Sequence, residues 1–330
     1  MMLKAIRFRN YKAFQEASLP LEPLTILIGP NGSGKTSALS AIQVMAAVAG
    51  NARMSGESLV PIGLDRSPCA SALEAVWDNS EVTEFTWEPG KVSRVETRRD
   101  PLAREHVARL QSGRVYVLEP AQIGAPVNLI KTLSVQENGY GLPSALTTLQ
   151  DHSPERFGAL NEDLRLWLPE FDRIVFDTPS PGQRSIALRT RQGKHSVPTS
   201  KLSTGTLLSL ALLSICHLPD PPKVIGLEEP DHGIHPRLLR NLKDSLLRLT
   251  SPEVFDDERD PVQVIVTTHS PYLVDLFRDE LESIVVTHKE GLYAKFSRLS
   301  DLPQVADIVK DSALGEAWYS GLLGGVPVGS

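Results

Sequence analysis

The sequence predicts an α/β fold with a mostly parallel sheet flanked by helices. Residues 29–36, Gly-Pro-Asn-Gly-Ser-Gly-Lys-Thr, fit the phosphate-loop pattern G-x-x-x-x-G-K-[ST] at every fixed position. An apolar strand over 24–28 precedes this loop, and a stretch with helical spacing over 36–49 follows it. The last third of the chain alternates strand and helix, which is the rhythm of a parallel sheet.

The phosphate loop predicts binding of a nucleoside triphosphate. Its glycines let successive backbone N–H groups surround phosphate oxygens, and the helix that follows adds the positive end of its dipole. Lys35 is expected to reach the β/γ-phosphates, and the Thr36 hydroxyl is expected to ligate Mg²⁺. The candidate nucleotide-binding residues of this segment are Asn31, Gly32, Ser33, Gly34, Lys35, Thr36 and Ser37. A glycine-rich turn without a ligand is disfavoured, because a strand and a helix flank the loop.

Composition narrows the class of protein. The 330 residues are 41% hydrophobic and 22% charged, which suits one large or two smaller globular domains. The formal net charge of -6 supplies no whole-molecule attraction to nucleic acid. Cys69 and Cys216 are the two cysteines, which suits a reducing cytoplasm, and no apolar run approaches the ~20 residues that span a bilayer. We expect a cytoplasmic protein that makes no membrane contact.

The first half of the chain is expected to be rich in strands. A strand begins at 3–8, and a second strand, 19–28, leads into the phosphate loop. An irregular segment, 50–68, follows the first helix. Three half-exposed strands then form a meander over 71–78, 82–88 and 91–97, and a further strand occupies 114–119.

The second half combines a helical region with the returning sheet. Helices are expected from about 144 to 168, with Ser153 as a helix N-cap, and a hairpin is expected over 184–190 and 194–197. A helix starts at Ser203. Strands at 223–228, 262–268 and 284–287 then alternate with helices at 236–249 and 271–277. We expect one nucleotide-binding domain over 1–330, made of a phosphate-loop region (1–50), an antiparallel β lobe (51–140), a helical lobe (141–222) and a final region (223–330).

Two carboxylates end the strand at 223–228. Strand C-termini face the ligand crevice of a parallel sheet, so Glu228 and Glu229 are expected to point at the triphosphate and its metal. Glu228 would hold Mg²⁺ through its water shell, and Glu229 would orient or deprotonate the attacking water. A solvated strand end is the alternative, and the phosphate loop upstream makes it the weaker one.

Two further polar positions follow the same logic. His269 ends the next strand and can donate a hydrogen bond to a γ-phosphate or to the attacking water, although a histidine satisfied within the core is the alternative. Ser203 is an N-cap residue before an apolar helix, and Gly205 permits close approach to that helix N-terminus. By themselves, cap and helix fit an anion site and a capped core helix equally well.

The order of four motifs, GPNGSGKT (29–36), LSTGT (202–206), GLEEPDHGIHP (226–236) and TTHSP (267–271), resembles the ABC-type ATPases. The likeness is greatest to the RecF/OLD/SMC-like branch, often called AAA-family ATPases, and residues 6–14 also resemble its opening strand. The resemblance implies a P-loop NTPase of ABC-ATPase type whose cofactors are ATP and Mg²⁺. It assigns Walker A to Lys35 and Thr36, the Walker B acid to Glu228 and the catalytic acid to Glu229.

The same resemblance assigns the remaining site residues. Asp231 belongs to the D-loop, His269 is the switch histidine, and Ser203 and Gly205 form the signature that acts on ATP bound by a second subunit. Lys12 matches a position where relatives place a basic residue near the nucleotide. The Q-loop glutamine, a metal-site residue of the family, is assigned to Gln122 first and to Gln136 second.

This sequence departs from the family pattern at two positions. Walker B usually ends in Asp-Glu, whereas this chain has Glu228 and Glu229, so the extra methylene weakens the case for direct Mg²⁺ coordination. Thr206 stands where the transporter signature carries Gln or Glu. The second departure favours the RecF/OLD/SMC-like branch.

Three other polar clusters could be ligand sites, and each has a simpler explanation. The basic stretch 184–201 alternates its charges along a hairpin and could contact nucleic-acid phosphates, but a solvated hairpin is favoured. The acidic stretch 255–260 could ligate a cation, but a solvated loop is favoured. His232 and His235 could suggest zinc, but the D-loop assignment explains them better.

Two function hypotheses follow from these observations. The first is an ATP-driven clamp or switch that homodimerises around two ATP molecules and serves DNA maintenance or anti-phage defence. Its effector would be a separate protein such as a nuclease, since the segment after His269 lacks the Glu plus Asp-x-Asp cluster of a TOPRIM nuclease. The alternative is a transporter ATPase subunit or a stand-alone metabolic NTPase. The tail at 314–325 resembles that of OLD-like ATPases and favours the first hypothesis.

Overall fold

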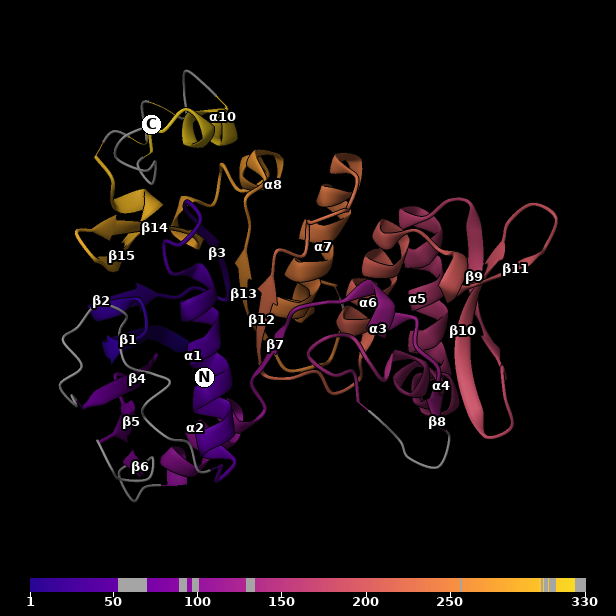
Figure 1. Cartoon of the computed structure of the whole chain (residues 1–330), viewed down its shortest axis with the longest axis horizontal. Coiled ribbons are helices and arrows are strands. Elements are labelled where there is room, and N and C mark those ends of the chain that lie inside the picture. The colour runs from indigo at the N-terminus through magenta and orange to yellow at the C-terminus, as the bar shows by residue number, and fades with distance from the viewer. Residues whose placement is uncertain are drawn as a thin grey trace. The chain divides into compact units, whose positions relative to one another are not determined.

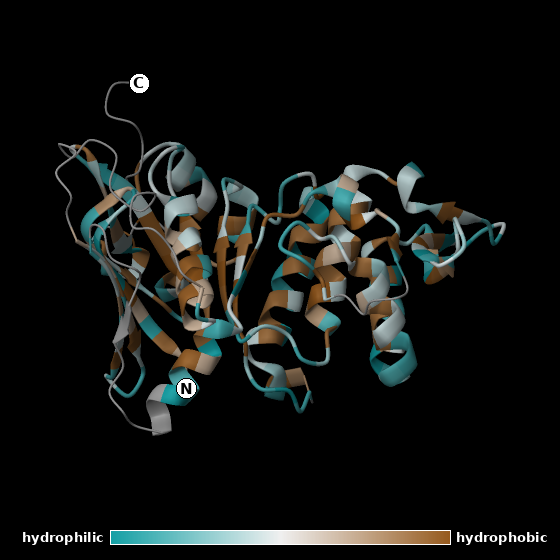
Figure 2. Cartoon of the chain, turned by 60° about the horizontal axis from the view of Figure 1, so that its bottom comes forward, coloured by the Kyte–Doolittle hydropathy of each residue, from teal (hydrophilic) through white to brown (hydrophobic). Residues whose placement is uncertain are grey.

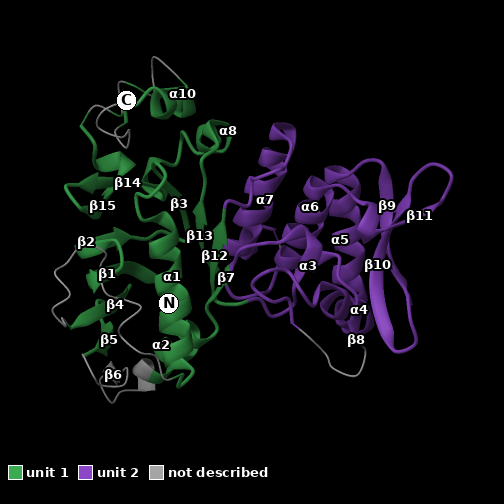
Figure 3. Cartoon of the chain, viewed as in Figure 1, with its two compact units in different colours: residues 1–115, 222–228, 261–330 green, residues 116–221, 229–260 purple. Residues whose placement is uncertain are grey.

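The computed structural model describes residues 1–52, 70–88, 94–96, 101–128, 134–255, 257–303, 305, 308 and 313–323, with 94–96 and 101–103 described through their backbone alone. The chain forms two compact units, coloured separately in Figure 3. Unit 1 contains residues 1–115, 222–228 and 261–330, and unit 2 contains residues 116–221 and 229–260. The prediction of a single domain over 1–330 stays a prediction.

A six-stranded sheet forms the centre of unit 1, in the order β15-β14-β3-β13-β12-β7. Its strands are β3 (Leu24–Ile28), β7 (Arg114–Tyr116, whose last residue belongs to unit 2), β12 (Val224–Glu228), β13 (Gln263–Thr267), β14 (Ile284–Glu290) and β15 (Tyr293–Arg298). Strands β12, β13, β3 and β14 pair in parallel, whereas β15 runs antiparallel to β14. Every residue of β3 and β13 is buried, as expected for parallel strands covered on both faces. The predicted mostly parallel sheet is present.

The second sheet of unit 1 is antiparallel, in the order β2-β1-β4-β5-β6. It contains β1 (Leu3–Tyr11), β2 (Phe14–Pro20), β4 (Ser71–Trp77), β5 (Val82–Trp87) and β6 (Arg94–Glu96). The prediction of one strand over 19–28 is wrong: β2 ends at Pro20 and pairs with β1, and β3 begins at Leu24 in the other sheet. Pro23 precedes β3, and the chain changes sheets between the two prolines. The predicted meander is present, although most of the predicted irregular segment 50–68 and the ends of the predicted strand 91–97 lie outside the described residues.

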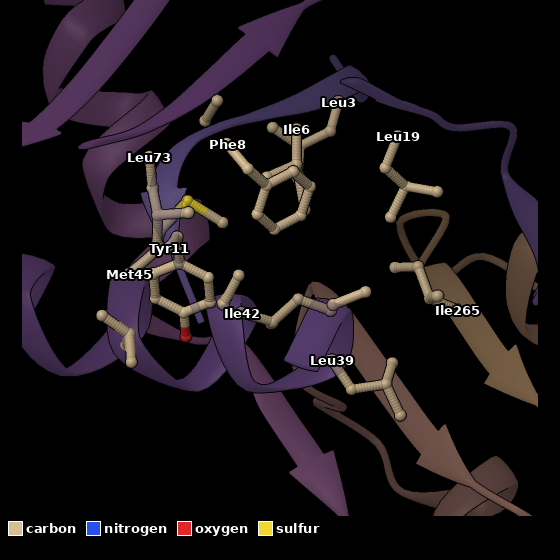
Figure 4. Close-up of a cluster of buried hydrophobic side chains, with 14 of the residues drawn as sticks. Leu3, Ile6, Phe8, Tyr11, Leu19, Leu39, Ile42, Met45, Leu73 and Ile265 are labelled. Atoms are coloured by element: carbon tan, nitrogen blue, oxygen red, sulfur yellow. The ribbon is translucent and has the colours of Figure 1, made fainter. Parts of the chain in front are cut away.

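The described helices of unit 1 are α1 (Lys35–Ala49), α2 (Pro101–Gln111), α8 (Pro271–Asp275) and α10 (Leu314–Tyr319). Helix α1 follows the phosphate loop, as predicted, and contacts β12 and β13 of the central sheet (Figure 1). Its buried side chains meet residues of β1 and β4 in one hydrophobic cluster. Figure 4 shows this cluster, in which Phe8 and Leu73 from the antiparallel sheet lie near Ile42 and Met45 of α1.

Unit 2 combines helices with a small antiparallel sheet. The helices are α3 (Pro120–Ile123), α4 (Leu142–His152), α5 (Pro154–Trp167), α6 (Thr204–His217) and α7 (Leu239–Thr250); the strands are β8 (Val127–Asn128), β9 (Phe171–Asp177), β10 (Gln183–Thr190) and β11 (Ser196–Pro198). Helix α6 is buried along its whole length from Thr206 to His217 and packs on α3, α4, α5 and α7. Figure 2 shows the hydrophobic residues gathered on helices and strands and many of the hydrophilic ones on the connections.

Short 3-10 turns complete the described chain: η2 (Thr199–Lys201), η3 (Pro236–Leu238), η4 (Pro252–Phe255), η5 (Leu281–Ser283) and η6 (Leu299–Asp301). Among the described residues, no helix has both the length and the apolar character that crossing a bilayer requires.

The acidic stretch 255–260 differs from the predicted solvated loop at Asp257. Its carboxylate accepts hydrogen bonds from Arg156 over 2.8 Å and from Arg259 over 2.8 Å. Burial opposes ionisation, but the two guanidinium groups outweigh it and hold the pKa of Asp257 well below its usual range. Arg259 also donates to the carbonyls of Cys216 and Leu218, each over 2.8 Å, so this segment fastens the end of α6.

Candidate nucleotide-binding site

Three glycines shape the predicted phosphate loop. Gly29, Gly32 and Gly34 have φ values of 149°, 72° and 106°, a region that side-chain-bearing residues rarely adopt. Gly34 stands at the N-cap of α1, so the loop passes directly into the first turn of a 15-residue helix. Left-handed residues beside a helix N-terminus turn backbone N–H groups toward one point and suit an anion.

Strand β14 supports this loop from behind. A Cβ atom on Gly29 would lie 2.2 Å from Oγ1 of Thr287, so no side chain fits there. Thr287 donates a hydrogen bond to the carbonyl of Ile28 over 3.0 Å, and its Oγ1 lies 2.6 Å from Oγ of Ser33. The buried hydroxyl of Thr287 therefore ties both ends of the turn to the sheet. Ser33 is buried by this contact, whereas Asn31 and Gly32 are exposed.

Lys35 is the first residue of α1, and its side chain folds back over the loop. The residue is 7% exposed, and Nζ donates to the carbonyls of Gly29 over 2.9 Å and Pro30 over 3.1 Å. The ammonium group is thus held over the turn that would surround phosphate oxygens. The Walker A role of Lys35 stays a prediction.

Thr36 and Glu228 meet at the end of the central sheet. The exposed Thr36 hydroxyl donates to Oε1 of Glu228 over 2.5 Å. A hydroxyl and a carboxylate are oxygen ligands of the kind that Mg²⁺ takes, so this pair fits the predicted metal site. Among the described residues, which include His232 and His235, no group of three or more His, Cys, Asp or Glu side chains is placed to hold a metal ion.

His269 leaves the sheet at the same edge as the loop and Glu228. Glu228 pairs with Thr267, and Thr267 pairs with Leu27, so β12, β13 and β3 end side by side. The backbone around His269 is held on both sides. The amide of Thr268 donates to the carbonyl of Leu27 over 3.2 Å, and Ser270 caps α8 through the amide of Leu273. His269 itself is half-buried.

Lys12 lies against the first turns of α1. Its Nζ donates to Oγ of Ser40 over 2.8 Å, and the Tyr11 hydroxyl lies 3.0 Å from the same atom. Ser40 in turn donates to the carbonyl of Ser37 over 2.8 Å. Burial lowers the pKa of Lys12 and raises the pKa of Tyr11 to about 12. Lys12 is therefore a basic residue beside the helix that follows the phosphate loop, and its predicted place near the nucleotide stays a prediction.

Glu229 has an unusual backbone. Its φ of 45° is left-handed, and a non-glycine residue in that conformation costs about 1–3 kcal/mol. The carbonyl of Glu229 accepts from the amide of His232 over 2.9 Å, and the carbonyl of Asp231 accepts from Ile234 over 3.1 Å. The predicted D-loop is therefore a tight turn. Strain at a residue expected to be catalytic is a pattern typical of functional sites.

The predicted signature caps a buried helix and contacts the D-loop within unit 2. Oγ of Ser203 accepts from the amide of Thr206 over 3.2 Å, which is an N-cap of α6. A Cβ atom on Gly205 would lie 2.5 Å from the carbonyl oxygen of Gly233. The glycine is therefore required by close packing on the D-loop. The residues themselves support both alternatives, a capped core helix and an anion site.

The predicted Q-loop residue Gln122 lies in the short helix α3 and is half-buried. The second candidate, Gln136, is exposed and donates to the carbonyl of Ser134 over 3.1 Å. Both glutamines and the signature belong to unit 2, whereas Lys35, Thr36, Glu228 and His269 belong to unit 1.

Sequence reasoning missed two residues beside the loop. Thr287 looks in sequence like an ordinary β-branched strand residue, and no local signal marks its contact with Ser33. Lys289 is exposed on the same strand, and its Nζ lies 4.0 Å from the position of a Cβ on Gly32. Lys289 is a second cation near the phosphate loop. Each is brought there by the parallel pairing of β14 with β3.

The basic hairpin is partly neutralised. Asp172 accepts hydrogen bonds from Arg189 over 2.7 Å and from Lys194 over 2.6 Å, which hold the pKa of its carboxyl well below the usual range. The guanidinium of Arg184 lies 5.6 Å from the centre of the Phe176 ring. Three of the charges expected to contact nucleic acid therefore have partners within the hairpin and its neighbour β9.

Two protein families match the chain. Residues 92–275 match the family described as "AAA domain, putative AbiEii toxin, Type IV TA system", and residues 1–86 match the family described as "AAA ATPase domain".

Curated relatives match shorter segments. The chain is 46% identical over 44 residues to the OLD nuclease of Thermus scotoductus, a match that covers 13% of this chain and 8% of that protein. It is 31% identical over 104 residues to the DNA replication and repair protein RecF of Gloeobacter violaceus, which covers 30% of this chain and 28% of RecF. The matches thus span less than a third of these relatives' lengths.

Solved structures with a similar fold include head domains of SMC proteins. An SMC head bound to the C-terminal winged-helix domain of ScpA aligns with a TM-score of 0.60 at 15% identity and covers 90% of this chain and 98% of that one. The SMC head domain of Thermotoga maritima aligns with a TM-score of 0.52 at 15% identity, over 90% of this chain and 99% of that one. The predicted fold class, a P-loop NTPase of ABC type, and the predicted likeness to the RecF/OLD/SMC branch are confirmed.

Proposed function

Because the chain belongs to the AAA-domain family that matches its residues 92–275, we propose that it binds and hydrolyses ATP as an ABC-type ATPase of the RecF/OLD/SMC branch. The observation that carries this proposal is the contact of the Thr36 hydroxyl with Glu228 beside a loop of left-handed glycines. A phosphate loop, an ammonium group and two oxygen ligands then converge at one sheet edge. That set of groups is the one that a Mg²⁺-bound triphosphate requires.

Each residue has a specific part in the proposed reaction. Lys35 would turn its ammonium from its own loop carbonyls to the β/γ-phosphates, and Thr36 and Glu228 would hold Mg²⁺, with Glu228 acting through water. Bound Mg²⁺ supplies charge neutralisation on the phosphate oxygens. Glu229 would accept the proton of the attacking water, and His269 would donate a hydrogen bond to the γ-phosphate.

We further propose that the active form is a homodimer with two ATP molecules between the subunits. In this arrangement Ser203 and Gly205 of one subunit contact ATP held by Lys35 of the other, with Asp231 nearby. Support comes from the N-cap geometry, which leaves the first turn of α6 able to bind an anion. ATP would favour the closed dimer and hydrolysis would open it, because nucleotide binds the two states with different affinity.

The proposed setting is DNA maintenance or anti-phage defence, together with a separate effector. Support comes from the matched relatives, one of which is an OLD nuclease and another a DNA replication and repair protein. Contact with nucleic acid through 184–201 is a weaker part of this proposal, because Arg189 and Lys194 are already paired with Asp172.

Nucleotide binding and phosphate release by the purified chain test this function. Lys35→Ala removes the cation of the loop, so ATP affinity should fall about 10- to 100-fold, the range expected for a lost charge-assisted hydrogen bond. Lys295→Ala is the matched control, because its Nζ donates to the carbonyl of Glu16 on another part of unit 1. Equal ATP affinity for the wild type and both variants would contradict the nucleotide site.

A further inference from the structure

An aromatic side chain from the last described helix lies beside the predicted switch histidine. The ring centroids of His269 and Trp318 are 6.5 Å apart, and the ring planes are inclined by 35°. This separation falls within the ~4.5–7 Å over which aromatic rings attract one another. Both side chains are half-buried. No motif in the sequence links these two residues.

Helix α10, which carries Trp318, is fastened to α8. A Cβ atom on Gly315 would lie 2.1 Å from the carbonyl oxygen of Pro271, so the two helices touch through their backbones. The amide of Gly315 also donates to Oδ1 of Asp275 over 2.7 Å. Leu314 and Ala317 are buried. The position of Trp318 is therefore set by α8.

Helix α8 begins two residues after His269, so the same element positions both rings. The backbone at His269 is fixed by the amide of Thr268, which donates to the carbonyl of Leu27 on β3, and by the Ser270 cap of α8. These contacts restrain the main chain, and the orientation of the imidazole is set in addition by its side-chain torsions. A flat ring that packs beside the imidazole restricts rotation about those torsions.

We propose that Trp318 is a positioning residue for ATP hydrolysis, which orients the imidazole of His269 toward the γ-phosphate. The inference rests on the proposed function and extends it to helix α10. It makes hydrolysis depend on the docking of α10 upon α8. Trp318 itself makes no contact with substrate in this scheme, so its removal should slow turnover and leave ATP binding unchanged.

Two substitutions separate orientation from simple packing. Trp318→Phe keeps a flat ring, and Trp318→Leu keeps apolar bulk without one. Trp318→Leu should lower kcat about 10- to 100-fold, the loss expected when a catalytic group is misplaced by about 1 Å, while Trp318→Phe should retain most of kcat. ATP affinity should stay within about twofold of the wild type in both variants, because the phosphate loop is untouched. Tyr319→Ala is the control on the same helix, since Tyr319 is 82% exposed.

A double-mutant cycle with His269→Ala shows whether Trp318 acts through the histidine. In the His269→Ala background, Trp318→Leu should cause little further loss of kcat. Equal kcat for wild type and Trp318→Leu, equal losses for the Phe and Leu variants, or additive losses in the cycle would each overturn the proposal. Absence of ATP turnover in the wild type would instead refute the proposed function. Thermal unfolding of each variant identifies any that fails to fold. If Trp318→Leu does not fold, the kcat of Trp318→Phe decides, and a large loss of kcat in that variant overturns the proposal.

Discussion

The hydroxyl of Thr36 donates a hydrogen bond to Oε1 of Glu228 over 2.5 Å, across 192 positions of sequence. Thr36 stands in the first turn of α1, and Glu228 is the last residue of β12. The contact joins the start of the helix after the phosphate loop to the end of β12. It brings together the hydroxyl that would ligate the proposed Mg²⁺ and the carboxylate that would hold the ion through water.

Glu228→Gln should therefore reduce the Mg²⁺-dependent part of ATP binding. The amide keeps the shape of the side chain but loses the negative charge that attracts the cation. Isothermal titration of ATP with and without Mg²⁺ measures the difference, which should shrink about tenfold or more relative to the wild type. Thr36→Ser retains the hydroxyl and serves as the control for the partner residue. An unchanged Mg²⁺ dependence in Glu228→Gln would exclude this carboxylate from the metal site.

Glu229→Gln should bind ATP normally and hydrolyse it about 10²- to 10⁴-fold more slowly, because the amide cannot accept the proton of the attacking water. Slow hydrolysis should keep the proposed dimer closed. Light scattering of the variant with ATP and Mg²⁺ should show twice the monomer mass. A monomer under these conditions, with ATP bound, would count against a dimer that holds ATP between its subunits. A loss of ATP binding equal to that of Glu228→Gln would show that the two acids have no separate roles.

Ser203→Arg should leave ATP binding intact and prevent the dimer from closing. The substitution puts a bulky side chain at the N-terminus of α6, at the place that the γ-phosphate of ATP bound to the partner subunit would occupy. Mixing this variant with Lys35→Ala tests the arrangement in trans. One composite site of the heterodimer then carries both changes and the other carries neither, so part of the ATPase activity should return. If heterodimers form but show no ATPase activity, the model of two independent sites, each completed by Ser203 of the partner subunit, is contradicted.

Thr287→Val should weaken both the fold and the loop. The substitution removes the hydroxyl that donates to Ile28 and contacts Ser33, and a buried polar group left without its partner costs about 1–3 kcal/mol. Chemical denaturation should show this loss in the free energy of unfolding, and ATP affinity should fall as the loop loosens. Thr287→Ser keeps the hydroxyl and should behave like the wild type. Equal ATP affinity in Thr287→Val would show that Thr287 supports the fold alone.

Much of the architecture could be predicted from local patterns. Buried apolar strands at β3, β12 and β13, the helix after the phosphate loop and the N-cap at Ser203 follow from burial periodicity and capping chemistry. The expectation of one strand over 19–28 merges the end of β2 with β3, because only Pro20 and Pro23 mark the change of sheet in this part of the sequence. Helices α2 and α10 and the edge strand β15 were not predicted, since their stability comes mainly from packing on neighbours.

The sequence by itself determined the phosphate loop, since Gly29, Gly32, Gly34, Lys35 and Thr36 are chemically specific at fixed spacing. It also determined the order of the strand-end residues Glu228 and His269. Only the tertiary structure decided which distant side chains reach them. Thr287 supports the loop because β14 pairs with β3, and Trp318 reaches His269 because α10 packs on α8. Such contacts depend on the pairing of remote segments, which local periodicity cannot encode.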